Sequence, residues 1–134
     1  MIRESNLNDL ELINSLMSYF NINVYNEINN PFVKFILCEI NGKIIGCIDY
    51  SFFDDRIEIN YIIVKEEYQH KGIATEMLEY MIEKCKTIEN ITLEVSTKNI
   101  KAINFYHKNG FIDVSIRKNY YSDGSDAIMM MRRF

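Results

Sequence analysis

Residues 68–74 read Tyr-Gln-His-Lys-Gly-Ile-Ala and place a glycine turn between an apolar run and an amphipathic one. The run 59–64 before the turn has the composition of a buried strand, and 73–85 after it carries apolar residues at helical spacing. This order predicts a strand, a tight turn at Gly72 and a helix. The glycine either serves the turn geometry alone or helps to hold a phosphate, because the first N–H groups of a helix lack partners within it.

The remainder of the chain alternates strand and helix patterns between clear turn signals. Asn41-Gly42 predicts a two-residue hairpin, because both turn positions need a positive φ angle. Gly110 is placed to end a helix in the left-handed conformation. The asparagine-rich segment 21–30 predicts a loop or a broken short helix. We expect the other helices and strands over 1–5 (strand), 8–20 (helix), 32–40, 43–52 and 56–64 (strands), 73–85 (helix), 91–96 (strand), 99–109 (helix), and 111–118 and 127–133 (strands).

These elements predict a single domain over 1–134 of the α/β (α+β) class. Their order favours one mixed, mostly antiparallel, twisted sheet with helices on both faces, because each helix has one apolar stripe to bury. In the first helix the predicted stripe comprises Leu10, Ile13, Leu16, Met17 and Phe20.

Composition excludes several classes of function. The chain has 134 residues, with 15 Lys and Arg against 19 Asp and Glu, so broad nucleic-acid binding is disfavoured and an anionic ligand must be held by local dipoles. No run approaches the ~20 apolar residues of a membrane span, and the first residues do not resemble a signal peptide. We expect Cys38, Cys47 and Cys85 to be reduced core residues of a cytoplasmic protein, with a nucleophilic cysteine as the alternative. His70 and His107 lack partners at ligand spacing, so we expect no metal site.

A second motif further along the chain changes the interpretation of the first. Residues 99–111 have the form NxxAxxFYxxxGF, and 69–74 have the form QxxGxA. Together with the opening 2–10, they resemble the GNAT superfamily of acyl-CoA-dependent N-acetyltransferases, over nearly the whole chain. The resemblance implies acetyl-CoA as co-substrate and an amine as acceptor. Ala74 stands where the family usually carries a second glycine, and many members have alanine there.

The C-terminal part of the chain narrows the resemblance. Segments 93–95, 117–121 and 123–130 resemble the ribosomal-protein-alanine N-acetyltransferase branch, which acetylates the N-terminal alanine of a small-subunit ribosomal protein. The segment 21–30 departs from that branch, so a small amine or a lysine side chain stays open as the acceptor. A third alternative is a non-catalytic acyl-CoA-binding module that senses acyl-CoA or docks a partner.

The resemblance also implies where the cofactor lies. Its pantetheine arm would pair with a strand edge as an added strand would, and Asn99 would hydrogen-bond that arm. From the residues alone, Asn99 is equally a helix N-cap. The implied edge residues are Ile62, Ile63 and Val64, and the implied pyrophosphate site is His70, Lys71, Gly72, Ile73, Ala74 and Thr75.

Two catalytic residues follow from the same resemblance. Glu94 alternates with Leu93 and Val95 in a predicted strand and is the implied general base; otherwise it is an ordinary exposed strand residue. Tyr106 is the implied proton donor to the coenzyme A thiolate; otherwise it is a buried core tyrosine. A protein α-amine titrates near ~8 and a lysine near ~10.4, so one carboxylate, acting directly or through water, suffices more readily for an α-amine.

The acceptor residues are expected in the loop between the last two predicted strands. By resemblance Tyr120 and Tyr121 shape the acceptor slot; alternatively they brace the hairpin. Asp123 and Asp126 in the same loop either attract an ammonium group or build the turn, and we favour the turn, because aspartates are common turn residues.

Overall fold

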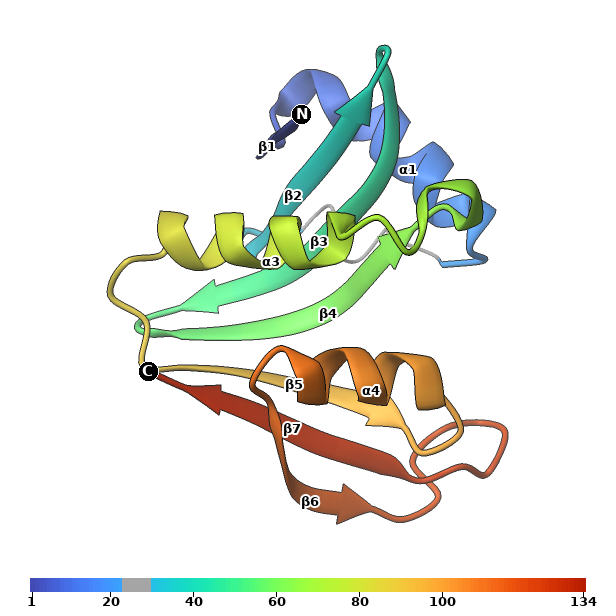
Figure 1. The fold of residues 1–134 in the computed structure, drawn as a ribbon, viewed down its shortest axis with the longest axis vertical. Helices are drawn as coiled ribbons and strands as arrows, with labels where there is room; N and C mark the ends of the chain where they lie inside the picture. The colour runs from blue at the N-terminus through green and yellow to red at the C-terminus, as the bar shows by residue number, and fades with distance from the viewer. Residues whose placement is uncertain (23–29) are drawn as a thin grey trace.

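The computed structural model describes residues 1–22 and 30–134, which form one sheet with helices on both faces (Figure 1). Most of the predicted loop or broken helix at 21–30 lies outside the described residues. The strands are β1 (Ile2–Glu4), β2 (Val33–Ile40), β3 (Lys43–Phe53), β4 (Arg56–Val64), β5 (Asn90–Ser96), β6 (Ile112–Arg117) and β7 (Ala127–Arg133). The helices are α1 (Leu10–Tyr19), α3 (Ile73–Lys84) and α4 (Ile100–Lys108), with the short 3-10 helices η1 (Leu7–Asp9) and η2 (Glu66–Tyr68).

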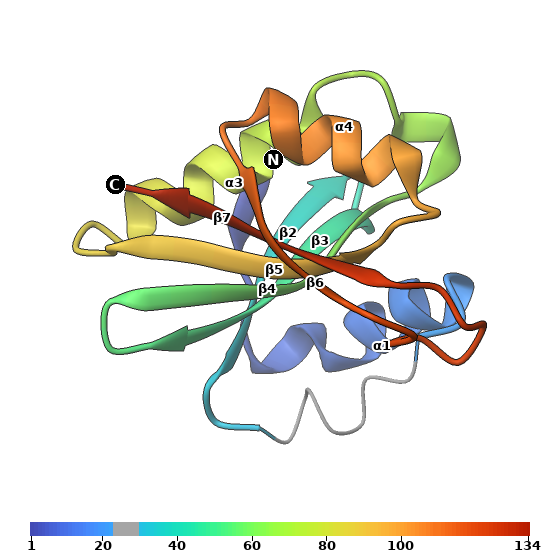
Figure 2. The same cartoon turned by 90° about the horizontal axis from the view of Figure 1, so that it is seen from below.

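The strand order across the sheet is β1-β2-β3-β4-β5-β7-β6. Neighbouring strands are antiparallel except β4 and β5, which run parallel. The predicted fold class is therefore confirmed, and the helices and strands follow one another along the chain in the predicted order. The twist of the sheet is visible in Figure 2.

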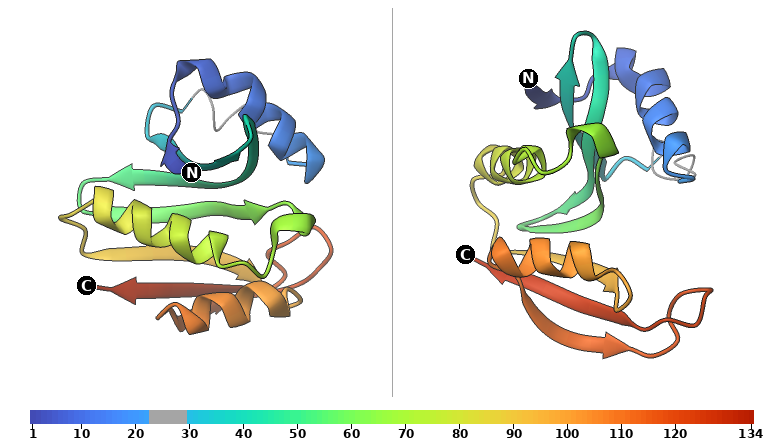
Figure 3. Two further views of the ribbon diagram at one scale, coloured as in Figure 1. Left: turned by 45° about the horizontal axis from the view of Figure 1, so that its top comes forward. Right: turned by 45° about the vertical axis from the view of Figure 1, so that its right-hand side comes forward.

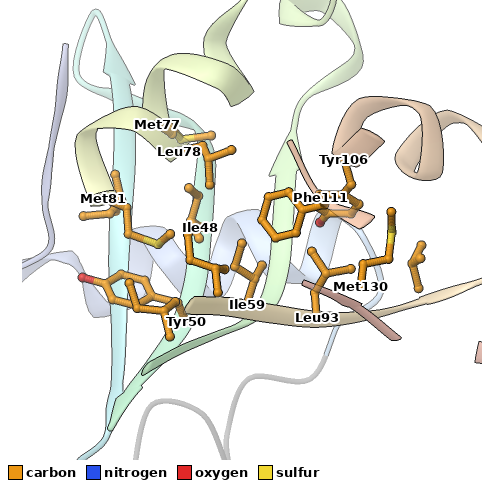
Figure 4. Close-up of a cluster of buried hydrophobic side chains, with 14 of the residues drawn as sticks. Ile48, Tyr50, Ile59, Met77, Leu78, Met81, Leu93, Tyr106, Phe111 and Met130 are labelled. Atoms are coloured by element: carbon orange, nitrogen blue, oxygen red, sulfur yellow. The ribbon is translucent and has the colours of Figure 1, made fainter. Parts of the chain in front are cut away.

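The helices cover opposite faces of this sheet (Figures 2 and 3). α1 packs through Ile13, Leu16 and Met17 on one face of β2 and β3. α3 and α4 lie on the other face and bury the larger core, part of which Figure 4 shows. That part includes Ile48, Tyr50, Ile59, Met77, Leu78, Met81, Leu93, Tyr106, Phe111 and Met130. None of the described helices has both the length and the apolar character needed to span a membrane.

Local turn signals and the cysteines agree with the sequence expectations. Asn41 and Gly42 have φ angles of 51° and 76°, as a hairpin with two left-handed turn positions requires. Cys38 and Cys47 are buried, Cys85 is partly buried, and none of them forms a disulfide. Burial raises the pKa of all three thiols, which disfavours the thiolate and supports a core role over a nucleophilic one.

The buried stripe of the first helix differs from the prediction at its start. Leu10 is 43% exposed, and Asp9, only 3% exposed, takes the inward position four residues before Ile13. The Asp9 carboxylate accepts hydrogen bonds from the two terminal guanidinium nitrogens of Arg3 at 2.7 and 2.8 Å and from the Asn6 N–H at 2.8 Å. The 3-10 turn before α1 directs the carboxylate inward to this partner, and hydrophobicity alone does not indicate such an arrangement.

Replacing Asp9 by Asn is expected to lower the free energy of unfolding by about 2–3 kcal/mol, because the partly buried Arg3 loses a bidentate charged partner. The Arg3 hydrogen bonds hold the pKa of Asp9 below its ordinary value. This stabilisation is therefore complete above about pH 4 and is lost as the pH falls through the lowered pKa. Urea unfolding at about pH 7 should show the full difference between wild type and Asp9→Asn, and at about pH 2 a smaller one. Equal stabilities near neutral pH would contradict this expectation.

Candidate active site

β4 and β5 separate part-way along their length. Their parallel pairing ends where Ile59 lies opposite Leu93, although β4 continues to Val64 and β5 to Ser96. Beyond that pair the two strands diverge (Figure 1). The residue of β5 that follows the last paired position is Glu94, so the implied general base stands at the start of the gap.

A β-bulge in β4 lies at the same level as the start of the gap. Asp49 pairs with Tyr61 and Tyr50 pairs with Ile59, which leaves Asn60 as an extra residue in β4. The side-chain amide of Asn60 donates a hydrogen bond to the Asp49 carboxylate at 3.1 Å. Because a bulge bends the strand that carries it, this one gives a physical reason for β4 to turn away from β5.

After Ile59, the edge of β4 that faces the gap has no neighbouring strand in the described part of the chain. The Lys65 N–H donates to the Ile45 carbonyl in β3 at 2.8 Å. The alternation of an antiparallel ladder therefore turns the backbone groups of Ile63 toward β3, and those of Ile62 and Val64 toward the gap. Of the three predicted edge residues, two present backbone hydrogen-bonding groups to the gap, and Ile63 lines the wall only.

A cavity of about 680 Å³ lies between this edge of β4 and the helices α3 and α4. A pocket of this size suits one small organic ligand. Lys71 does not line it; its ammonium group lies over the Tyr68 ring, 5.7 Å from the centre. The other predicted cofactor residues all line the cavity: Ile62, Ile63, Val64, His70, Gly72, Ile73, Ala74, Thr75 and Asn99.

The start of α3 contributes unpaired backbone N–H groups to this cavity. Gly72 is the N-cap with a φ angle of 80°. The N–H groups of Ile73, Ala74 and Thr75 find no acceptor among the residues that the structure describes. With the positive end of the helix dipole, these groups form a place for an anion. A Cβ at position 72 would meet no protein atom within 4 Å, so the chain itself needs glycine there for its left-handed backbone.

Gln69 and Lys101 join the glycine turn to α4 at one side of the cavity. The Gln69 side-chain nitrogen donates to the Val64 carbonyl at 2.8 Å, and the Lys101 ammonium donates to the Gln69 side-chain oxygen. The motif QxxGxA contains the glutamine, but the sequence does not indicate either contact.

Tyr106 projects from α4 into the core beside Phe111 (Figure 4), and it also lines the cavity. It is 8% exposed, and its ring packs edge-to-face against Phe105 and Phe111 with centre-to-centre distances of 5.4 Å. Burial raises the pKa of the hydroxyl, and the nearby Tyr121 raises it further. The hydroxyl is therefore protonated at neutral pH, as a proton donor must be.

Asn99 begins α4, and its position is compatible with both of its expected roles. Its side-chain oxygen accepts a hydrogen bond from the Ala102 N–H at 3.2 Å, which makes it the N-cap. It also lines the cavity, and its side-chain nitrogen is a donor that the cap does not use.

Glu94 lies on the sheet face opposite α4, because its neighbours Leu93 and Val95 point into the larger core. Arg117 Nε lies 3.2 Å from Glu94 Oε1. The Tyr120 hydroxyl donates a hydrogen bond to the same carboxylate, which raises the pKa of Tyr120. The Arg117 guanidinium also lies over the Tyr120 ring, 5.6 Å from its centre. Each of these three side chains therefore interacts with the other two, and we call them the Glu94 cluster: Glu94, Arg117 and Tyr120.

The loop between β6 and β7 reaches both implied catalytic residues. The Tyr120 and Tyr121 rings pack at right angles, 5.0 Å apart. Burial raises the pKa of Tyr121, and the charge of Glu94 adds to the effect. Tyr121 likewise raises the pKa of the Tyr106 hydroxyl, so this one side chain acts electrostatically on Tyr106 and is itself acted on by Glu94.

The two aspartates of this loop build the turn, as the sequence favours. Asp123 Oδ1 accepts from the Ser125 N–H at 2.8 Å, and Asp126 Oδ1 accepts from the Asn119 N–H at 2.9 Å. Over residues 1–22 and 30–134, no group of three His, Cys, Asp or Glu side chains is arranged to hold a metal ion.

Comparison with known proteins agrees with this architecture. A model of the acetyltransferase (GNAT) family matches residues 5–111, which include the gap, the glycine turn and both sequence motifs. The chain belongs to the GNAT acetyltransferase family. This membership bears out the resemblance that the motifs indicate.

Individual GNAT proteins are also similar to this chain over most of its length. A putative ribosomal-protein-bS18-alanine N-acetyltransferase of Bacillus subtilis is 32% identical over 110 residues, covering 79% of this chain and 73% of that protein. An N-alpha-acetyltransferase of Sulfurisphaera tokodaii is 32% identical over 111 residues, which cover 72% of this chain. The match spans 66% of the length of that relative, slightly less than two thirds. The crystal structure of Ard1 from Thermoplasma volcanium has a TM-score of 0.86 at 25% identity and covers 99% of this chain and 96% of that one.

Proposed function

We propose that this GNAT protein transfers the acetyl group of acetyl-CoA directly to an amine. The observation that carries the proposal is the gap between β4 and β5, with Tyr106 on its α4 side and Glu94 on the opposite face of the sheet. A thioester in the gap would therefore be open to an amine arriving from the Glu94 face, while its sulfur lies on the Tyr106 side.

The cavity has the groups that coenzyme A needs. Three unpaired N–H groups at the start of α3 suit a pyrophosphate. The backbone N–H and carbonyl of Ile62 and the N–H of Val64, with the spare donor of Asn99, suit the amides of a pantetheine arm, while the Val64 carbonyl already accepts from Gln69. No Asp or Glu of the described ranges 1–22 and 30–134 lines the cavity, although the chain has a net charge of −4. An anionic ligand is thus favoured here and not over the surface as a whole.

Tyr106 is the proposed general acid. As the amine nitrogen bonds to the carbonyl carbon, the bond from that carbon to sulfur breaks and a thiolate leaves. The Tyr106 hydroxyl, kept protonated by burial, donates its proton to the sulfur, which leaves as a free thiol.

Glu94 is the proposed general base. It accepts a proton from the acceptor nitrogen, directly or through water, so that the neutral amine attacks. Arg117 and Tyr120 hold the carboxylate in place. A pre-positioned carboxylate at the start of the gap is what proton removal requires.

We further propose a protein N-terminal α-amine, of the ribosomal-protein-alanine type, as the acceptor. The names of the Bacillus subtilis and Sulfurisphaera tokodaii relatives support this choice. The chemistry supports it too, because deprotonating a lysine at neutral pH costs about 3 kcal/mol more than deprotonating an α-amine. Tyr120 and Tyr121 would border the acceptor slot.

An acetylation assay with matched peptides tests the acceptor. The protein is incubated with acetyl-CoA and one of three peptides: a peptide that starts with Ala, the same peptide with a blocked α-amine, and the blocked peptide with an internal lysine. Mass spectrometry should find acetylation of the free α-amine only. Acetylation of the blocked lysine peptide at a comparable rate would contradict the α-amine proposal and favour a side-chain amine.

A further inference from the structure

The positive charges around the cavity suggest how this chain recognises its cofactor beyond the glycine turn. Two lysines line the cavity, Lys101 and Lys108, and both lie on α4. With Asn104 they occur at positions i, i+3 and i+7, so they share one face of the helix, about 10 Å apart along its axis. The buried face of α4 is a different one, formed by Ile103 and Tyr106.

Both ammonium groups have hydrogen-bonding capacity left for a ligand. Lys101 donates to Gln69, which fixes it next to the glycine turn and leaves two of its three N–H donors unused. Lys108 has no hydrogen-bond or ion-pair partner among the described residues. Among the residues that the structure describes, no carboxylate lines the cavity to neutralise either charge.

Coenzyme A carries one more phosphate group than the N–H groups of the glycine turn can bind. The N–H groups of Ile73, Ala74 and Thr75 suit one diphosphate. The ligand carries in addition a 3′-phosphate monoester on its ribose, and such a group bears a charge of about −1.5 to −2 at neutral pH. A charge of that size favours ammonium partners on the wall next to the turn, and that wall is α4.

We propose that Lys101 and Lys108 form a subsite for the 3′-phosphate and make the protein selective for coenzyme A over its 3′-dephospho form. The inference rests on the proposed acetyl-CoA site and adds the residues that bind the 3′-phosphate of the ribose. Lys101 approaches the phosphate from the turn side and Lys108 from further along α4.

Calorimetric titration of the whole protein with coenzyme A and with 3′-dephospho-coenzyme A tests the subsite. Wild type should bind coenzyme A about 3- to 10-fold more tightly, the range for one or two exposed charge pairs. The Lys101→Met/Lys108→Met double variant should bind the two ligands almost equally, because it loses affinity only for the phosphorylated one. The advantage of wild type should also shrink with added salt.

Matched variants separate charge recognition from a structural effect. Lys101→Arg/Lys108→Arg should keep the preference, and Lys43→Met, at the start of β3, should leave both affinities unchanged. If Lys101 serves only to hold Gln69, Lys101→Met will weaken both ligands equally, and this result overturns the proposal. Equal binding of the two ligands by wild type, or an unchanged preference in the double variant, overturns it as well. If wild type binds neither ligand, the acetyl-CoA site itself is wrong.

Discussion

Tyr106→Phe is expected to lower kcat for acetyl transfer by about 100-fold or more, the usual contribution of a positioned general acid. The variant removes one hydroxyl and keeps the ring that packs against Phe105 and Phe111. Folding and cofactor binding should therefore persist, while the departing thiolate loses its proton donor. Steady-state kinetics with a saturating acceptor measures kcat, and calorimetry with coenzyme A measures binding separately.

The control for this variant is Tyr80→Phe. Tyr80 lies on α3, is partly buried in the same core and does not line the cavity. It loses the same atom and should keep the parent rate. If Tyr106→Phe acetylates as fast as the parent, Tyr106 is a packing residue only. If Tyr106→Phe fails to bind coenzyme A, the Tyr106 hydroxyl contributes to cofactor binding and not to proton transfer.

Glu94→Gln is expected to lower kcat/KM for the amine by about 100- to 1,000-fold, because the amide cannot accept the proton that the attacking nitrogen must lose. The side chain keeps its size, and the exposed Arg117 can be solvated in its place. The affinity for coenzyme A should stay within about 2-fold, because Glu94 lies on the other face of the sheet from the cavity lining.

A distant glutamate and a second acceptor sharpen this test. Glu83→Gln removes a carboxylate from the exposed side of α3 and should leave the rate unchanged. Acceptors of higher pKa need more help with deprotonation, so among α-amine peptides Glu94→Gln should slow the one with the higher amine pKa more. A kcat/KM within a few-fold of the parent would show that the nitrogen loses its proton elsewhere. It would also reduce the Glu94 cluster to a structural group.

The order of elements and the turns could be predicted because both depend on neighbouring residues. The hairpin at Asn41-Gly42 and the helix end at Gly110 need left-handed backbone, and few residues other than glycine and asparagine supply it. Leu10 was not predicted correctly, because the inward position goes to Asp9 through its ion pair with Arg3. The position of β7 between β5 and β6 depends on contacts distant in sequence and is not indicated by local patterns.

The candidate site also contains some residues that the sequence motifs predict and others that only the strand pairing reveals. The two motifs indicate the glycine turn, Asn99 and Tyr106, and the structure places all of them around one cavity. Arg117 could not be found, because it meets Glu94 only through the register of β6, β7 and β5. The same holds for the bulge at Asn60, since an unpaired residue is visible only once the partner strand is known.

A crystal structure with acetyl-CoA bound would show whether the gap between β4 and β5 holds the thioester. We expect the pyrophosphate against the N–H groups of Ile73, Ala74 and Thr75, the pantetheine arm along Ile62 and Val64, and the sulfur within hydrogen-bonding reach of the Tyr106 hydroxyl. Density for the ligand at another place, with these N–H groups contacting only solvent, would contradict the account.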